Sequence, residues 1–347
     1  MAKMSDKRFA LPWAAPSLPW WPLRGGWKTT EDESAIDGKL LVFSRFKAVP
    51  TALSGLISYT TESRLLSKPG TRSKVSYEAA SKRRWLQSSP DRPNLLELFH
   101  PSRLLAELDP LVAPMGNLAG MKQAVESQLR SRLKALGVRV VTGAKLPRRK
   151  PWELLVVLEA KAGLWADSAL AWKAVAPYSE DDETVGRLGQ MLEKWEKVAS
   201  QADELTEISR ETDLPELVAL ALESPAVVLL RALSRHWPEA MASQNLQKVI
   251  SVVWRGLRTY LDKAWFVSVL VERDGGNYPD AIRKSVLEGN LESVLDEHFW
   301  FLSMDGAGGW AGRLDDVEMG LRLRDASVAF HEAGPSGGVD TESSRPF

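Results

Sequence analysis

The sequence predicts a mainly α-helical protein in which a helical bundle is attached to a small α/β unit. Two observations support this prediction. Between residues 104 and 330, apolar side chains recur every three or four residues, the spacing that places them on one face of a helix. Ahead of that region, residues 39–43 form one short apolar run, typical of a buried parallel strand, and helical spacing follows it.

The composition is that of a globular protein and excludes several classes of chemistry. The 347 residues include 45 basic and 45 acidic side chains, so no net field would attract nucleic acid or an anionic membrane. Cysteine is absent, which rules out disulfides and thiol nucleophiles. The four histidines are far apart in sequence and lack metal-ligand spacing. We therefore expect no metal site and no catalytic residues.

The sequence also predicts a cytoplasmic protein without membrane contact. Residues 1–8 are polar and lead into no apolar run of signal-peptide length. The longest apolar stretch, Ala264 to Val271, is far shorter than the ~20 residues that span a bilayer.

Residues 1–38 are predicted to form an extended strap. Prolines and tryptophans are interleaved through it, at Pro12, Trp13, Pro16, Pro19, Trp20, Trp21, Pro22 and Trp27. Proline at this density prevents both helix and sheet hydrogen bonding, and the indoles need a surface to lie on. We therefore expect the strap to pack against another part of the chain.

Residues 39–66 are predicted to be a strand–loop–helix unit. The strand ends at Ser44–Lys47, and Pro50 suits the first turn of the helix that follows. The only other short apolar strand candidate is Val138 to Thr142. Residues 67–103 are basic and contain four prolines, which predicts a mobile connection with one short helix inside it.

Residues 104–330 are predicted to form the helical bundle, and residues 331–347, which lack core-forming side chains, a disordered tail. One apolar stripe consists of Met121, Val125, Leu129, Leu133 and Leu136, and Gly137 is expected just after the helix C-cap. A second consists of Leu188, Met191, Leu192, Trp195, Val198, Ala199, Ala202 and Leu205. Further helices are predicted from Pro215, over Leu246–Val271 and over Val286–Leu302.

Two segments share features with nucleotide-binding motifs, but a structural role explains each of them better. Gly116–Lys122 has the glycines of a P-loop, but the wrong spacing and no hydroxyl after the lysine, which predicts a loop before a helix. Asp296–His298 lie within a helical pattern instead of after a buried strand, which predicts an ordinary amphipathic helix.

Two basic clusters lie beside tryptophans and are candidate nucleic-acid contacts. They are Lys82, Arg83 and Arg84 before Trp85, and Arg148, Arg149 and Lys150 before Trp152. Cationic side chains neutralise phosphates, and an exposed indole can stack on a base. The alternative interpretation is that both are solvated loops, where such clusters are common.

The run Lys39–Pro50, followed by Ala52–Tyr59, resembles the first strand and helix of the second RecA-like lobe of superfamily 2 helicases. It is particularly similar to large bacterial helicase-related proteins of the phage-defence type. In that family a proline- and aromatic-rich segment like Leu11–Trp21 precedes the strand, and a long helical insertion follows it. Gly289–His298 resembles part of that insertion. The resemblance implies a partial RecA-like lobe, and places Ser44, Arg45 and Lys47 against the backbone of DNA or RNA.

The resemblance also implies motor parts that this sequence does not contain. Full-length family members use ATP and Mg²⁺, held by a P-loop, an acidic box and an arginine-finger helix. None of these motifs is found here, so we expect no cofactor and no ATP turnover in this chain alone.

Two hypotheses for the function follow. The first is a fragment of an ATP-dependent helicase or translocase from a truncated or split gene, with weak binding to nucleic acid. Its other partners would be the remaining helicase portions or other defence proteins. The second is an independent α-helical scaffold that binds another protein.

Overall fold

The computed structural model describes residues 11–13, 15–28, 85–143, 146–178, 182–262, 277–304 and 309–318, with Leu56, Thr60 and Leu321. Within these residues the protein is mainly α-helical, as predicted, and the strands form one two-stranded parallel sheet. The predicted strand of residues 39–43, most of the helix after it and the tail of residues 331–347 lie outside the described residues.

The elements occur along the chain in the following order. They are a 3-10 turn Gly25–Trp27, a 3-10 turn Pro93–Leu95, α3 Leu96–Phe99, α4 Arg103–Ala106, a 3-10 turn Pro110–Val112, α5 Leu118–Ala135, β1 Arg139–Val141, α6 Pro151–Lys161, α7 Trp165–Val175, a 3-10 turn Ala176–Tyr178, α8 Asp182–Ala199, a 3-10 turn Ala202–Glu204, β2 Glu207–Ser209, α9 Asp213–Glu223, α10 Pro225–His236, 3-10 turns Pro238–Met241 and Ser243–Asn245, α11 Leu246–Ser251, a π-helical segment Val252–Leu257, α12 Arg258–Leu261, α14 Tyr278–Glu288 and α15 Leu291–Met304.

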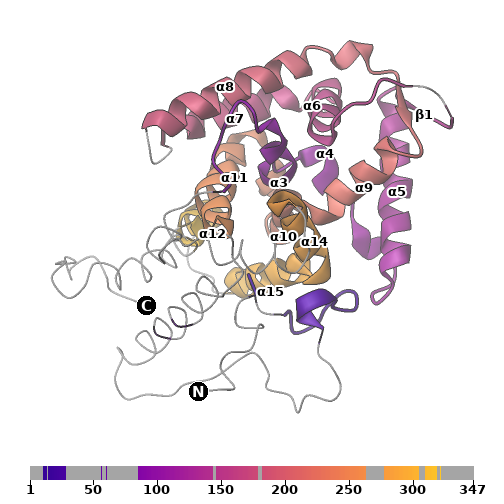
Figure 1. Ribbon diagram of the computed structural model, residues 1–347. Helices are drawn as coiled ribbons and strands as arrows, with labels where there is room; N and C mark the ends of the chain where they lie inside the picture. The colour runs from indigo at the N-terminus through magenta and orange to yellow at the C-terminus, as the bar shows by residue number, and fades with distance from the viewer. Residues whose placement is uncertain are drawn as a thin grey trace, which may run out of the picture.

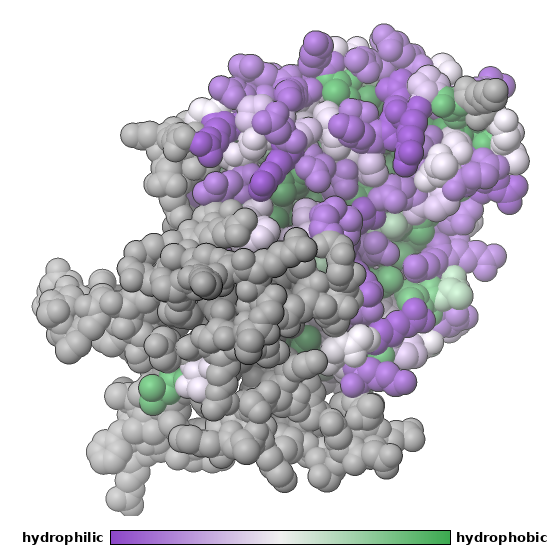
Figure 2. Space-filling model, in the orientation of Figure 1, coloured by the Kyte–Doolittle hydropathy of each residue, from purple (hydrophilic) through white to green (hydrophobic). Residues whose placement is uncertain are grey.

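Helix α10 lies at the centre of the bundle (Figure 1). Its residues 225–233 are all buried, as expected for a helix that other elements surround. It packs against α15, α9, α4 and α3, while α8 lies across α6 and α7 at the upper edge of Figure 1. Figure 2 shows that the described part of the same face is mainly hydrophilic, with small apolar patches. The apolar side chains therefore serve mainly to build the core.

Helix α5 confirms the first predicted stripe. Met121, Val125, Leu129 and Leu133 are fully buried. Gly137 has a φ of 71°, and the N–H of Val138 donates to the carbonyl of Leu133 at 2.8 Å. This pattern closes the helix in the way predicted for a glycine after the C-cap. The second stripe is also buried from Leu188 to Trp195, although α8 ends at Ala199.

Two predicted helices are interrupted. The helix predicted over Val286–Leu302 is two helices, α14 and α15, which Gly289 and Asn290 separate. Asn290 has a φ of 49°, a conformation that breaks helical hydrogen bonding. The helix predicted from Pro215 begins at Asp213 and ends before Ser224, where α10 continues at an angle of 58°. Over 246–262 the chain is helical with a π-helical segment, and residues 263–271 lie outside the described residues.

The described end of the predicted mobile connection belongs to the core, which corrects the boundary predicted at residue 104. Leu86, Leu96, Leu98 and Phe99 are fully buried in the main hydrophobic cluster. The prolines of this segment break it into a 3-10 turn and short helices, but its apolar side chains pack against α6 and α10. In this segment burial of apolar area outweighs the poor helix propensity of the local sequence.

The strand candidate at Val138 to Thr142 is confirmed as β1. It pairs in parallel with β2, with Val140 opposite Ile208, a partner that was not predicted. Among the described helices, none alone is long and apolar enough to span a membrane. The bent pair α9 and α10 meets that test only together.

Candidate functional site

The basic cluster before α6 is the part of the predicted nucleic-acid site that the structure describes. Arg148 and Lys150 are exposed and Arg149 is half-buried. The backbone N–H of Lys150 donates to the carboxylate of Glu153 at 2.9 Å, and Pro151 is the first residue of the helix. The main chain of Lys150 therefore fixes the start of α6, while its charged side chain extends into solvent.

The tryptophan of this cluster cannot stack on a nucleic-acid base. Trp152 is only 4% exposed and belongs to the main core, and its backbone N–H donates to Glu97 at 3.2 Å. The predicted combination of cations with an exposed indole is thus wrong for Trp152, because the second residue of α6 faces inward. Trp85 is half-buried. Ser44, Arg45, Lys47, Lys82, Arg83 and Arg84 lie outside the described residues.

The segments that share features with nucleotide-binding motifs have structural roles, as predicted. Asn117 caps α5, accepting from the N–H of Gly120 at 2.9 Å, so this amide is not free to bind a phosphate. Asp296 lies 3.1 Å from Nε2 of His236. No group of three or more metal-ligating side chains occurs in the described part of the chain.

The proline–tryptophan strap docks on the junction between α14 and α15. Trp20, Trp21 and Trp27 are at most 7% exposed. The side-chain amide of Asn290 accepts from the N–H of Trp21 at 3.3 Å and donates to its carbonyl at 3.0 Å. The prediction that these indoles pack on another part of the chain is confirmed.

Helix α15 continues this interface along the strap. The carboxylate of Glu297 accepts from the backbone N–H groups of Ser17 and Leu18 at 3.0 and 2.9 Å. Ser293 donates its hydroxyl to the carbonyl of Leu18 at 2.9 Å. These bonds satisfy backbone groups that an extended, proline-broken segment cannot pair internally.

Gly289 allows the strap to approach closely. A Cβ at this position would lie 2.5 Å from the Trp27 ring and 2.7 Å from Nε1 of Trp13. The two rings stack on each other with their centroids 5.2 Å apart, so neither can move without disturbing the other. The backbone of Gly289 has a φ of −95°, which any residue can adopt.

Replacing Gly289 with alanine is therefore expected to loosen the strap and leave the helices folded. The clash should destabilise strap docking by about 1–3 kcal/mol. Hydrogen exchange at the amides of Ser17, Leu18 and Trp21 should accelerate, while α10 stays protected. Gly189→Ala in α8 is the matched control, since nothing lies within 4 Å of its Cβ. It should stabilise the helix by about 0.5–1 kcal/mol. Unchanged exchange at the three strap amides in Gly289→Ala would contradict the expected clash.

A buried histidine–glutamate pair lies between α3, α6 and α7. His100 and Glu159 are fully buried, with His100 Nε2 3.1 Å from the Glu159 carboxylate. His100 Nδ1 accepts from the indole N–H of Trp172 at 3.2 Å, so its proton is on Nε2. Burial opposes ionisation of Glu159, but His100, the Ser102 hydroxyl and the Leu104 N–H outweigh it and lower its pKa. Because no side chain of the pair reaches solvent, the pair has a structural role.

A buried ion pair joins α10 to α15. Arg231 and Glu292 are 2% and 1% exposed, and Nε of Arg231 donates to Glu292 at 2.7 Å. Arg231 also donates to the carbonyls of Leu108 and Ala221, and Arg235 lies 2.6 Å from the same carboxylate. Burial opposes ionisation of Glu292, but the two arginines outweigh it and lower its pKa.

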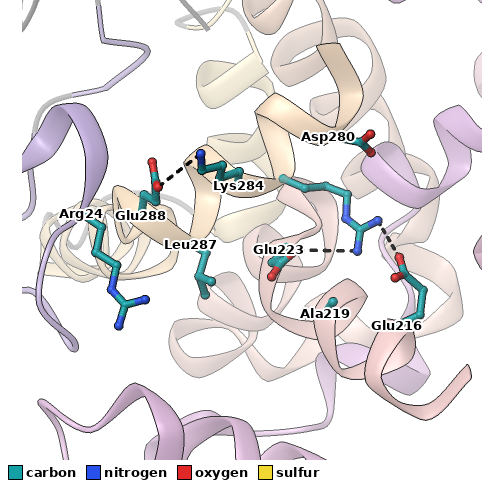
Figure 3. A pocket seen from close by; sticks show the side chains of 9 residues that line it. Arg24, Glu216, Ala219, Glu223, Asp280, Lys284, Leu287 and Glu288 are labelled. Atoms are coloured by element: carbon teal, nitrogen blue, oxygen red, sulfur yellow. Dashed lines mark ion pairs between the residues drawn. The ribbon is translucent and has the colours of Figure 1, made fainter. Parts of the chain in front are cut away.

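A cavity of about 420 Å³ lies between α9, α14 and the strap (Figure 3). Arg283 of α14 reaches Glu216 at 2.6 Å and Glu223 at 3.6 Å, and Lys284 lies 3.9 Å from Glu288. Most of the charges in the lining are therefore already paired with one another. Arg24, on the strap, is exposed at the edge of the cavity.

Behind the cavity, Glu97 has an unusual proton affinity. Burial raises its pKa to about 7, against the attraction of Arg283, which lies 3.8 Å away. A carboxyl group that titrates near neutrality is common in acid–base sites. Glu97, however, does not line the cavity, and its other oxygen accepts from the backbone of Trp152. This geometry makes it a linker between α3, α6 and α14.

No protein-family model, curated protein or solved structure matches this chain significantly. The fold and the described sites define a helical module in which strap docking and buried ion pairs hold distant segments together. The buried pairs Arg231–Glu292 and His100–Glu159 were not predicted from the sequence. The available signal was a single charge inside a strongly apolar run, as at Arg231 within α10.

Proposed function

We propose that this chain is the helical module of an ATP-dependent helicase or translocase, lacking the ATPase motifs itself. The observation that supports the proposal is the docking of the strap. Leu11–Trp21 and Gly289–His298, two separate segments that resemble the helicase family, form a single interface through Asn290, Ser293 and Glu297. Contact between the two segments is the arrangement expected if both belong to one helical module.

The docking also suggests how such a module would work. The strap directly precedes residues 39–66, the expected start of the motor lobe, in the sequence. A strap fixed to α14 and α15 would hold that lobe against the helical bundle. ATP and Mg²⁺ would then be bound by motor parts supplied from elsewhere, with the complex acting in the cytoplasm.

The first test is catalytic. We expect the purified chain not to hydrolyse ATP above background, with or without DNA, because it has no phosphate cradle, acidic box or arginine finger. Phosphate release with and without Mg²⁺ measures this. An Mg²⁺-dependent ATPase that elutes with the chain through two different columns would contradict the proposal.

The second test is salt-dependent binding to nucleic acid through Arg148, Arg149 and Lys150. With Lys82, Arg83 and Arg84 they offer six cations, so log affinity should fall with log salt with a slope of at most about 4–5. Replacing Arg148, Arg149 and Lys150 with alanine should lower that slope by at most about 2–3. Fluorescence anisotropy with single-stranded DNA at several salt concentrations measures both.

A charge-matched control separates a local contact from a general effect of charge. Lys122, Lys134 and Lys197 are exposed on α5 and α8, and replacing all three with alanine should change the slope much less. Equal slopes for the two triple variants would show that residues 148–150 are a solvated loop. Binding that persists at 1 M salt would also contradict a contact to phosphates.

A protein-binding scaffold is the second candidate, favoured by one feature of α15. Trp300, Phe301 and Met304 are 55%, 68% and 66% exposed, which is unusual for large apolar side chains. A stable protein partner that is lost when these three are replaced by serine, with no nucleic-acid affinity, would favour the scaffold.

A further inference from the structure

The end of α14 presents a row of hydrogen-bond acceptors that the strap satisfies. The last carbonyls of a helix have no donor within the helix. Here three carbonyls at this end receive an N–H from the strap: Trp21 Nε1 to Leu287 at 2.6 Å, Arg24 N to Glu288 at 3.0 Å and Trp13 Nε1 to Gly289 at 3.0 Å. Two indoles and one backbone amide therefore cap this helix.

Part of the strap packs in a hydrophobic cluster that is separate from the main core. Trp20 and Trp21 bury their rings with Leu118 and Met121 of α5, and this cluster is separate from the main core. Trp13, by contrast, packs against the main core, and the hydroxyl of Tyr260 in that core donates to the carbonyl of Pro12. No described strap residue is among the buried members of the main core, so the strap can leave while that core stays packed.

The contacts between strap and junction are those of an extended peptide bound to two helices. They join residues 264 to 280 positions apart, so they are long-range tertiary contacts and not local ones. They also discriminate between side chains, because the Trp21 ring is 2% exposed whereas the Leu18 side chain is 76% exposed. The junction therefore recognises the indole of Trp21, but only the backbone of Leu18.

We propose that the junction of α14 and α15 is a recognition site for an extended proline- and tryptophan-rich peptide, with residues 11–28 as its resident occupant. The ligand class follows from the acceptors. The prolines of such a peptide keep its backbone extended, so the backbone N–H groups of the peptide remain free to bond to Glu297 and Asn290. Its indoles supply both apolar area and the N–H groups that cap α14. This inference does not depend on the proposed helicase role.

The experiment uses the full chain with a protease cleavage site inserted after Lys28. After cutting, size-exclusion chromatography with mass spectrometry measures how much of the N-terminal piece stays bound. A fluorescent peptide of residues 11–28 is then added, and anisotropy follows its exchange with the cut piece. Two further peptides carry Trp21→Ala and Leu18→Ala.

We expect the cut piece to be retained and then replaced by the labelled peptide. The Trp21→Ala peptide should bind at least about 30-fold more weakly, since it loses a buried ring and its N–H donor. The Leu18→Ala peptide should bind within about twofold of the original, because only its backbone is used. Three results would overturn the proposal: no peptide binding, retention of the cut piece without exchange over several days, or equal weakening by the two substitutions.

Discussion

Replacing Glu292 with alanine is expected to lower the free energy of unfolding by about 3–5 kcal/mol, the largest effect of any single substitution considered for this protein. The reason is the position of Arg231, which is 2% exposed at the centre of the bundle. Without Glu292, the guanidinium of Arg231 keeps its carbonyl partners but has no counter-charge, and water cannot reach this buried group. Arg235, on the same helix, would lose a partner at 2.6 Å as well.

Urea unfolding followed by far-UV circular dichroism measures this effect. Glu126→Ala provides the control, because Glu126 pairs with Arg130 at 2.8 Å on the surface of α5, with both side chains at least 35% exposed. Its loss should cost no more than about 0.5 kcal/mol. Equal stability of the Glu292→Ala and Glu126→Ala variants would contradict this prediction, because Arg231 would then have to be hydrated or paired with another anion in the folded protein.

Glu292→Gln separates charge from packing at the same position. The amide keeps the volume and one acceptor oxygen, but it cannot balance a guanidinium. We expect an intermediate loss of stability, because the hydrogen bond survives in part while the charge remains unpaired.

The sequence predicted those parts of the fold where one local pattern decides the structure. The stripe of α5 predicts a helix with one buried face, and Gly137 ends it, because both depend only on residues within a few turns. The strap was predictable for the same reason, since alternating proline and tryptophan exclude regular structure and require a packing surface.

What could not be predicted depends on distant partners. Val286 to Leu302 keeps helical spacing across Gly289 and Asn290, so periodicity alone predicts one helix. The break is stabilised by Trp21, which lies 269 positions away in the sequence. The candidate site shows the same limit, because the exposure of Arg148 follows from local charge, whereas the burial of Trp152 depends on how α6 packs against α3 and α8.

A pH-dependent loss of stability is the second large effect expected, and it arises at Glu97. Burial raises the pKa of this carboxyl to about 7 in the folded protein, whereas the usual value is 4.5. Between these two values the folded state binds more protons than the unfolded state. The free energy of unfolding therefore falls as pH rises from about 4.5 to 7. A shift of this size corresponds to about 3–4 kcal/mol.

Comparing wild type with Glu97→Gln isolates this contribution from other titrating groups. Burial also raises the pKa of Glu223, while the lowered pKa values of Glu159 and Glu292 matter only in more acidic solution. These groups are present in both proteins, so the difference between the two stability curves reports Glu97. Arg283, Glu216 and Asp280, the charged groups that act on Glu97, are also unchanged.

The variant and the wild type should have similar stability at pH 5, where Glu97 is protonated and resembles the amide. At pH 8 the variant should be more stable, by up to about 3–4 kcal/mol, because the wild type must hold a buried carboxylate there. Urea unfolding at half-unit steps of pH measures the difference. For the surface variant Glu126→Gln, the plot of unfolding free energy against pH should run parallel to that of the wild type. Parallel curves for Glu97→Gln would show that Arg283 at 3.8 Å is enough to keep the carboxylate ionised at little cost.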